Sequence, residues 1–181
     1  MSGARYCLRC GGRLRSVVED GRRRLRCRRC GFTFYGNPVP AAVAVILRGG
    51  RVLLGRRARP PYAGTWDLPG GFLEAGETPE RCLARELSEE LGVATRRARL
   101  IGFVTDRYGP RGLPLLTIVY RVTPGPGRLT PADDVAEARW FPPRAVPYRA
   151  IAFRGLRKVL RAYLGGRRRR GASKSLVLDS G

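Results

Sequence analysis

The sequence predicts an α/β fold, in which helices cover both faces of a mixed sheet, with a small cysteine-rich ribbon in front of it. Three observations support this prediction: two Cys-x-x-Cys pairs near the start of the chain, apolar runs typical of strands in its middle, and two amphipathic helical patterns. Of the 181 residues, 43% are hydrophobic, so one core of ordinary size can form without disulfide bonds.

The expected strands are separated by turns rich in glycine and proline. An almost continuous apolar run over residues 39–47 indicates a buried strand, and residues 51–57 read as its hairpin partner across Gly49 and Gly50. Further strands are expected at residues 66–68, 99–105, 115–122 and 138–141. These segments are sufficient for one sheet.

Two segments carry the pattern of amphipathic helices. The first covers residues 78–91, with Thr78 as its N-cap, Pro79 at the first helical position and Gly92 as its stop. Its leucines recur every four residues and form the face that should pack on the sheet. The second helix is expected at residues 151–164.

An acidic cluster lies within a strongly basic chain. Thirty-six basic residues against fourteen acidic ones give a net charge of +22, yet six of the fourteen acids lie between residues 74 and 90. Glu86, Glu89 and Glu90 share one helix face, where their mutual repulsion favours a bound cation. Carboxylates suit Mg²⁺ or Mn²⁺. The chain contains no histidine, so a metal site must use carboxylates, thiolates or backbone oxygens.

Residues 71–93, GFLEAGETPERCLARELSEELGV, resemble the Nudix box at all nine of its specified positions. These positions are Gly71, Glu77, Arg85, Glu86, Leu87, Glu89, Glu90, Gly92 and Val93. Flanking segments such as VAVILRGGRVLLGRRA and EARWFPPRAVP extend the resemblance over residues 38–165. It implies a Nudix-type α/β/α sandwich around a mixed sheet. It also implies a pyrophosphohydrolase that cuts a phosphoanhydride bond in a nucleoside diphosphate linked to another moiety.

The resemblance assigns roles to the box glutamates. Glu89 and Glu90 would be the principal ligands of Mg²⁺ or Mn²⁺, and Glu86 would be a further ligand or the general base. A backbone carbonyl near Gly70 or Gly71 would complete the coordination.

Other acids and one arginine would support this centre. Arg85 and Glu77 would pair and hold the box helix and its preceding loop in register. Members of this family often place an additional carboxylate in a later loop. The candidates here are Asp133, Asp134 and Glu137, each of which could instead be an exposed loop acid.

The substrate is less well defined by the sequence. A cysteine ribbon ahead of such a domain resembles NADH pyrophosphatases, but TDRYGPRGLPLL after the box lacks their glutamine and tryptophan. We therefore favour ADP-ribose-like compounds, with NADH or dinucleoside polyphosphates as further candidates. Trp66, Tyr108 and Glu137 are the candidate substrate contacts, although the two aromatic rings could simply pack.

The cysteine spacing C-x2-C-x16-C-x2-C predicts a structural zinc site within residues 1–36. Its ligands would be Cys7, Cys10, Cys27 and Cys30. Disulfides or free thiols are the alternatives. A fifth cysteine, Cys82, lies on the box helix, where it is either a redox-sensitive thiol or a small buried filler.

Arginine supplies 34 of the 36 basic residues and is spread over the chain. It reflects either a coding bias or a surface for polyanions. A non-catalytic regulator that binds nucleotides or nucleic acid through the ribbon and the tail is therefore the alternative function, although the intact box argues against it. Residues 166–181 are expected to form a disordered basic tail. A homodimer is compatible with the sequence.

Localisation is expected to be cytoplasmic, because no secretory signal is recognisable in the first residues. No apolar run approaches the roughly 20 residues of a membrane span, so no membrane partner is expected.

Overall fold

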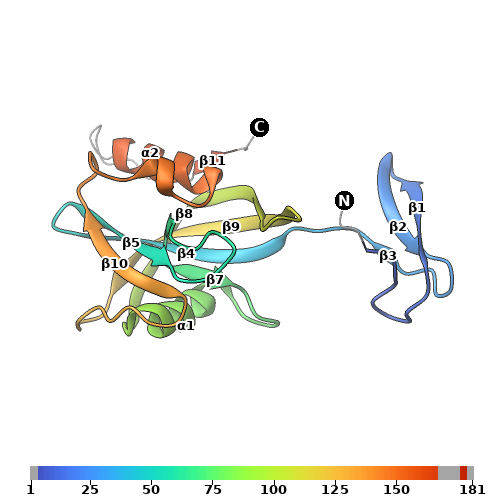
Figure 1. Ribbon diagram of the computed structural model, residues 1–181, viewed down its shortest axis with the longest axis horizontal. Helices are drawn as coiled ribbons and strands as arrows, with labels where there is room; N and C mark the ends of the chain where they lie inside the picture. Colours follow the sequence, from blue (N-terminus) through green and yellow to red (C-terminus); the bar gives the residue numbers. More distant parts are fainter. Residues whose placement is uncertain (1–3, 167–175, 179–181) are drawn as a thin grey trace. The chain divides into compact units, whose positions relative to one another are not determined.

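The computed structural model describes residues 4–166 and 176–178, and the chain divides into two compact units, Met1–Pro38 and Val39–Gly181 (Figure 1). The first unit is a three-stranded antiparallel sheet. Its strands are β1 (Leu14–Glu19), β2 (Arg22–Cys27) and β3 (Thr33–Phe34), in the order β1-β2-β3. Asp20 and Gly21, both with positive φ, make the tight turn between β1 and β2.

Eight strands of the second unit form one mixed sheet. They are β4 (Val39–Arg48), β5 (Arg51–Arg57), β6 (Trp66–Asp67), β7 (Gly70–Phe72), β8 (Thr95–Tyr108), β9 (Leu113–Pro124), β10 (Val135–Phe141) and β11 (Leu176–Leu178). The order is β10-β5-β4-β9-β8-β11, with β6 beside β5 and β7 beside β4. The β4–β9 and β8–β11 pairs are parallel and the other pairs are antiparallel.

Two helices, α1 (Pro79–Leu91) and α2 (Arg154–Gly166), cover opposite faces of this sheet (Figure 1). Strand β4 separates two buried clusters. Val43 and Val45 belong to the cluster that contains α2, and Ala44 and Ile46 belong to the cluster that contains α1. Burial on both faces explains the continuous apolar run of this strand. The predicted α/β/α arrangement is confirmed.

Helix α1 begins and ends where its capping residues predict. The hydroxyl of Thr78 accepts a hydrogen bond from the backbone N–H of Arg81, and Pro79 occupies the first helical position. Gly92 ends the helix in the left-handed region, with a φ of 66°.

Helix α2 begins three residues later than expected. Ile151 forms a β-bridge with Trp66, which holds the chain extended after the short 3₁₀ helix Tyr148–Ala150. The carboxylate of Asp106, from β8, then accepts the backbone N–H of Gly155 at 3.0 Å. A side chain distant in sequence therefore sets the start of this helix, which the local pattern could not indicate.

The sheet is also larger than expected. Strands β8 and β9 extend beyond the apolar segments, and β7 was missed because two glycines conceal it. Most of the expected disordered tail, residues 166–181, lies outside the described residues. Within the described part, however, Leu176–Leu178 runs parallel to Gly102–Val104 of β8, because a short apolar segment can complete the hydrogen bonds of an open sheet edge.

The helices among the described residues are too short or too polar to cross a membrane.

Candidate active site

Three glutamates of α1 reach the same region with very different exposure. Glu90 is buried, with 6% of its surface exposed, and its carboxylate accepts the backbone N–H of Gly70 at 2.9 Å. The Glu86 side chain is 15% exposed and that of Glu89 is 48% exposed. The helix therefore presents a row of carboxylates that runs from the interior to the surface.

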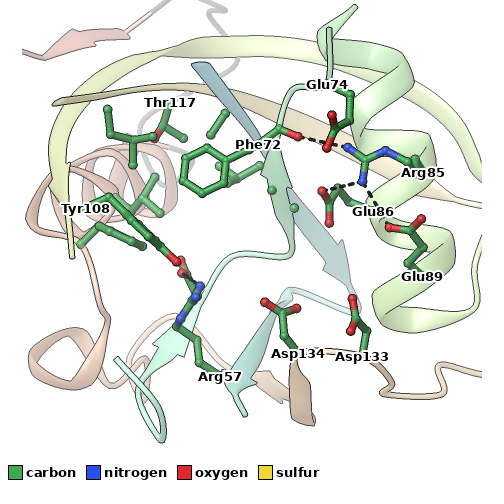
Figure 2. Close-up of a pocket in the computed structure, with 18 residues that line it drawn as sticks. Arg57, Phe72, Glu74, Arg85, Glu86, Glu89, Tyr108, Thr117, Asp133 and Asp134 are labelled. Carbon is green, nitrogen blue, oxygen red and sulfur yellow. Dashed lines mark hydrogen bonds and ion pairs between the residues drawn. The ribbon is translucent and has the colours of Figure 1, made fainter. Parts of the chain in front are cut away.

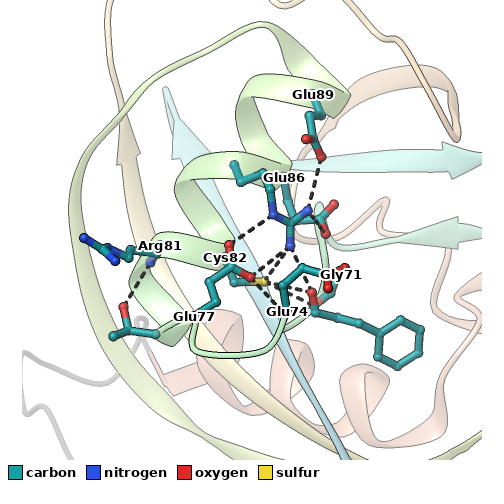
Figure 3. A network of polar contacts seen from close by, with 10 residues as sticks. Gly71, Glu74, Glu77, Arg81, Cys82, Glu86 and Glu89 are labelled. Carbon is teal, nitrogen blue, oxygen red and sulfur yellow. Dashed lines mark hydrogen bonds and ion pairs between the residues drawn. The ribbon is translucent and has the colours of Figure 1, made fainter.

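Arg85 connects this row to the loop before the helix. Its guanidinium binds both carboxylate oxygens of Glu77 at 3.0 Å, Glu86 at 2.8 Å and Glu89 at 3.2 Å (Figure 3). It also donates to the backbone carbonyl of Phe72 at 3.0 Å. A planar, permanently charged fork suits this bidentate contact. Arg85 thereby fixes the loop and the helix in one register, and its hydrogen bond lowers the pKa of Glu77.

One further buried acid joins the box glutamates. Asp67, at the end of β6, is buried and pairs with Arg57 at 3.2 Å. Burial raises the pKa of Asp67 to about 6 and that of Glu90 to about 9. The charges of Asp134 and Glu86 add to the shift of Glu90. Burial raises the pKa of Glu86 as well. Such a concentration of desolvated carboxylates fits a divalent cation, which would replace protons as the compensating charge.

A pocket of about 300 Å³ opens beside these acids. Arg85, Glu86 and Glu89 lie on one side of it and Tyr108 and Thr117 on the other (Figure 2). The remaining polar lining comes from Arg57, Asp67, Glu74, Asp133 and Asp134, and the apolar lining from Ala41, Val43, Phe72, Leu115, Phe153 and Leu156. The pocket thus joins a charged half to an apolar half, as sites for nucleotides often do.

Comparison with known proteins decides the family. A family model described as the NUDIX domain matches residues 37–163. The chain belongs to the NUDIX family. It is 33% identical over 178 residues to the NAD-capped RNA hydrolase NudC of Pseudomonas aeruginosa, which covers 96% of this chain and 59% of that protein. It is 36% identical over 112 residues to the ADP-ribose pyrophosphatase of Methanocaldococcus jannaschii, covering 61% of this chain and 65% of that protein.

The NUDIX chain therefore spans about three fifths of the length of these curated relatives. A solved NUDIX hydrolase from Nitrosomonas europaea matches nearly the whole chain. Its TM-score is 0.78 at 27% identity, with 97% of this chain and 98% of that chain covered. A solved MutT NUDIX hydrolase from Burkholderia pseudomallei matches 61% of this chain with a TM-score of 0.58 and 34% identity. The predicted family is confirmed.

The NUDIX pocket contains some of the expected substrate contacts and not others. Tyr108 lines it and packs edge-on against Phe72, with ring centroids 5.1 Å apart. Trp66 does not line it, because its ring packs against Phe141 with centroids 4.9 Å apart. Glu137 lies outside it on β10 and is paired with Arg139. For Trp66, the alternative of core packing describes its surroundings. Glu137 is neither a pocket residue nor an exposed loop acid, because it is half-buried on β10 and paired with Arg139 and Arg56.

Sequence reasoning missed several lining residues of the NUDIX pocket. Asp67 and Arg57 form a pair that is visible only when β5 and β6 lie side by side. Phe153 comes from the segment that leads into α2, far along the chain from the box. Of the candidate later carboxylates, Asp133 and Asp134 do line the pocket. The sequence offered one signal for these missed residues, namely Asp67, a charged residue within an apolar segment.

Gly71 lies directly against the box helix. Its carbonyl accepts from the thiol of Cys82 at 3.5 Å, and a Cβ at this position would collide with the Glu86 carboxylate. We expect Gly71→Ala to displace Glu86 and lower kcat by about tenfold to 100-fold, because small displacements of reacting groups are costly. Gly165→Ala is the matched control, since its Cβ would meet open space. Steady-state kinetics of both variants test this, and wild-type turnover by Gly71→Ala would contradict it.

Cys82 is fully buried beneath the loop of the NUDIX box. Burial raises the pKa of its thiol to about 11, and the charges of Glu86 and Glu77 add to the shift. These properties favour the buried filler over the redox-sensitive thiol. We expect alkylation of Cys82 in the folded protein to be at least about 100-fold slower than that of a free cysteine. Mass-spectrometric mapping after timed alkylation measures this, and rapid labelling of Cys82 without unfolding would restore the redox hypothesis.

The four ribbon cysteines converge on one point. The sulfurs of Cys7, Cys10, Cys27 and Cys30 all lie within 4.8 Å of one another, so together they could hold a metal ion. The backbone N–H of Arg29 donates to the Cys27 sulfur at 3.3 Å. Hydrogen bonds from the amides of Cys30 and Arg29 lower the pKa of Cys27 to about 6, whereas, despite a hydrogen bond from the Gly12 amide, the neighbouring thiols raise the pKa of Cys10 to about 11. Sets of four cysteine thiolates are typical ligands of structural Zn²⁺.

Proposed function

We propose that the chain is a pyrophosphohydrolase that cuts the phosphoanhydride bond of a nucleoside diphosphate linked to a second moiety. The observation that carries this proposal is the row of carboxylates on α1, partly buried and held by Arg85, beside a pocket that is half charged and half apolar. A structural acidic helix face would be solvated. Here Glu90 and Asp67 are buried beside other acids, which is unfavourable for folding alone and fits catalysis.

Glu86, Glu89 and Glu90 would hold Mg²⁺ or Mn²⁺. The metal, when bound, would offset the charge of the diphosphate and make a bound water more acidic. Arg85 orients Glu86 and Glu89 through its hydrogen bonds, so it acts as a positioning residue. Glu86 and the pocket acids Asp67 and Asp134 are the groups that could accept a proton from the attacking water.

The apolar half of the pocket would bind the nucleoside. Phe72, Tyr108 and Phe153 form a group of aromatic rings there, with the Tyr108 and Phe153 rings within 18° of parallel. Such rings can pack against a base or a ribose. Arg57 lines the same pocket and pairs with one carboxylate, that of Asp67, whereas Arg85 is engaged by three glutamates, so Arg57 is the arginine with more capacity to face a phosphate.

We propose an ADP-ribose moiety as the recognised part of the substrate. The names of the two relatives specify NAD-capped RNA and ADP-ribose, and both compounds contain ADP joined through its diphosphate to a ribose. This agrees with the preference for ADP-ribose-like compounds over dinucleoside polyphosphates. The structural Zn²⁺ of the ribbon, the cytoplasmic location and the homodimer also remain proposals.

A substrate panel with Mg²⁺ tests the proposal. We expect cleavage of ADP-ribose, NADH or NAD-capped RNA, with a mononucleotide among the products identified by mass spectrometry. Diadenosine polyphosphates and oxidised nucleoside triphosphates complete the panel. Turnover of these last compounds alone would exclude the ADP-ribose preference. No metal-dependent turnover of any compound would overturn the enzyme assignment and favour a binding regulator.

A further inference from the structure

The hairpin of the first unit carries its arginines on one side. Arg22, Arg24 and Arg26 alternate along β2, so they share a face of the sheet. The register places Arg15 of β1 opposite Arg26, on the same face. Among the arginines of β1 and β2, Arg23 alone belongs to the other face. We call Arg15, Arg22, Arg24 and Arg26 the arginine face.

The opposite side of the same hairpin is largely apolar. Leu14, Val18, Leu25 and Cys27 lie there together with Ser16 and Arg23, and Phe34 of β3 pairs with Leu25 on that side. A coding bias toward arginine would scatter this residue over both faces. Four of the five arginines of β1 and β2 instead share one face, on which Val17 is the only apolar residue of these two strands, and this asymmetry indicates that the arginine face has a role of its own.

An exposed aromatic ring lies beside the arginine face. The guanidinium of Arg24 lies over the ring of Tyr35, 4.9 Å from its centroid, and donates to the Tyr35 carbonyl at 3.0 Å. Tyr35 nevertheless remains 54% exposed to solvent. Cationic side chains combined with exposed rings are typical of surfaces that bind single-stranded nucleic acid, because every base offers a face for stacking.

The charge of the first unit is poorly compensated. Ten arginines against Glu19 and Asp20 give residues 1–38 a net charge of +8, which four thiolates around Zn²⁺ would lower to +6. The carboxylate of Glu19 already forms an ion pair with the guanidinium of Arg26, with an N–O distance of 2.6 Å. Arg15 faces Arg26 directly, and like charges in this arrangement destabilise a sheet. A polyanion on the arginine face would remove this repulsion.

We propose that the arginine face and Tyr35 bind single-stranded RNA, with the arginines on its phosphates and the Tyr35 ring stacked on a base. The choice of RNA among polyanions rests on the proposed function, in which a nucleotide joined to RNA is one substrate class. The binding itself requires no hydrolysis. A duplex would satisfy the arginines but would leave Tyr35 without an unpaired base.

Fluorescence anisotropy with the full chain tests the arginine face. The probe is a labelled single-stranded RNA of about 20 nucleotides, longer than a typical single-strand site, with a 5′-monophosphate and no phosphoanhydride bond. We expect the triple change Arg15→Gln, Arg22→Gln, Arg24→Gln to weaken binding at least about tenfold and to reduce the slope of log K against log salt by about 2.

The matched control removes three exposed arginines of β8, Arg96→Gln, Arg97→Gln and Arg99→Gln. Its affinity should stay within about threefold of wild type, because these arginines do not belong to the arginine face and the general attraction of exposed charges is largely screened at about 0.15 M ionic strength. An equal loss in both triple variants would overturn the proposal, because net charge alone would then explain binding.

The Tyr35 ring has its own test. Tyr35→Leu should weaken RNA binding by at least about fivefold, whereas Tyr35→Phe should retain it, because stacking needs the ring and not the hydroxyl. Equal affinity of Tyr35→Leu and wild type, or duplex RNA bound as tightly as the single strand, would overturn the role of base stacking and with it the proposal.

Turnover of ADP-ribose by the same variants separates this inference from the proposed function. Unchanged turnover with lost RNA binding is the expected result. If wild type fails to bind the RNA but cleaves ADP-ribose, the arginine face is excluded as an RNA site and the hydrolase stands. If it binds the RNA but cleaves nothing, the hydrolase fails and the binding surface stands.

Discussion

Glu90→Gln is expected to lower kcat by at least about 100-fold, because loss of groups that merely support metal ligands already costs tenfold to 100-fold. The glutamine keeps the size of the side chain and an oxygen that can accept the N–H of Gly70. Its neutral amide also resembles the protonated acid that burial favours in the metal-free protein. Thermal stability without metal should therefore be unchanged or slightly higher, which separates a loss of chemistry from a loss of fold.

The control for this change is Glu137→Gln. Glu137 undergoes the same chemical replacement but lies outside the pocket, paired with Arg139 on β10. Its stability should change by no more than about 0.5 kcal/mol and its turnover should be that of wild type. Steady-state kinetics across a Mg²⁺ titration, with thermal melts of each variant, provide the comparison. If Glu90→Gln kept most of its turnover, Glu90 would not be a metal ligand in the reaction.

Removal of the Zn²⁺ proposed for the ribbon is expected to unfold the first unit and leave the second folded. The first unit has fewer than 40 described residues, and its buried apolar residues are chiefly Cys7 and Cys27. A unit of this size rarely folds without a metal or disulfides. Structural Zn²⁺ contributes about 10–16 kcal/mol in comparable peptides, so its loss should be decisive.

Two-dimensional NMR spectra recorded before and after chelation measure this effect directly. Signals of the first unit should collapse to unfolded positions while those of the second unit remain dispersed. Cys30→Ser should reproduce the effect of chelation, and Cys82→Ala, which leaves the four ribbon sulfurs in place, should not. A ribbon that stays folded after complete metal removal would show that its sheet needs no metal.

The sequence predicted best where structure depends on neighbours in the chain. The caps Thr78 and Gly92 and the leucine period defined α1, and the turn at Gly49 and Gly50 defined the start of β5. The prediction from sequence failed where contacts between segments far apart in the chain determine the structure. The start of α2 depends on Asp106, and the Arg57–Asp67 pair depends on the contact of β5 with β6.

The candidate site was likewise predicted well where its residues are close in sequence and poorly where they come from distant segments. The box glutamates and Arg85 lie on one helix and its preceding loop, so their spacing was enough to bring them together. The other lining residues of the pocket come from several strands, from the segment before α2 and from α2 itself. Trp66 could not be told from a packing residue by type alone, because an aromatic ring is equally suited to a core and to a base.

Helices α1 and α2 lie on opposite faces of the sheet, yet both contribute to one pocket: Glu86 and Glu89 from α1, and Phe153 and Leu156 from the opposite layer. In the proposed function, the metal-binding carboxylates thus come from α1, whereas the apolar wall is built partly by the α2 layer and partly by the strands. Substitutions in the α2 layer can reshape the apolar wall without disturbing the carboxylates. The carboxylate of Asp106 holds the start of α2. A substitution of Asp106 would therefore lower the stability of the fold and also alter the apolar wall that selects the substrate.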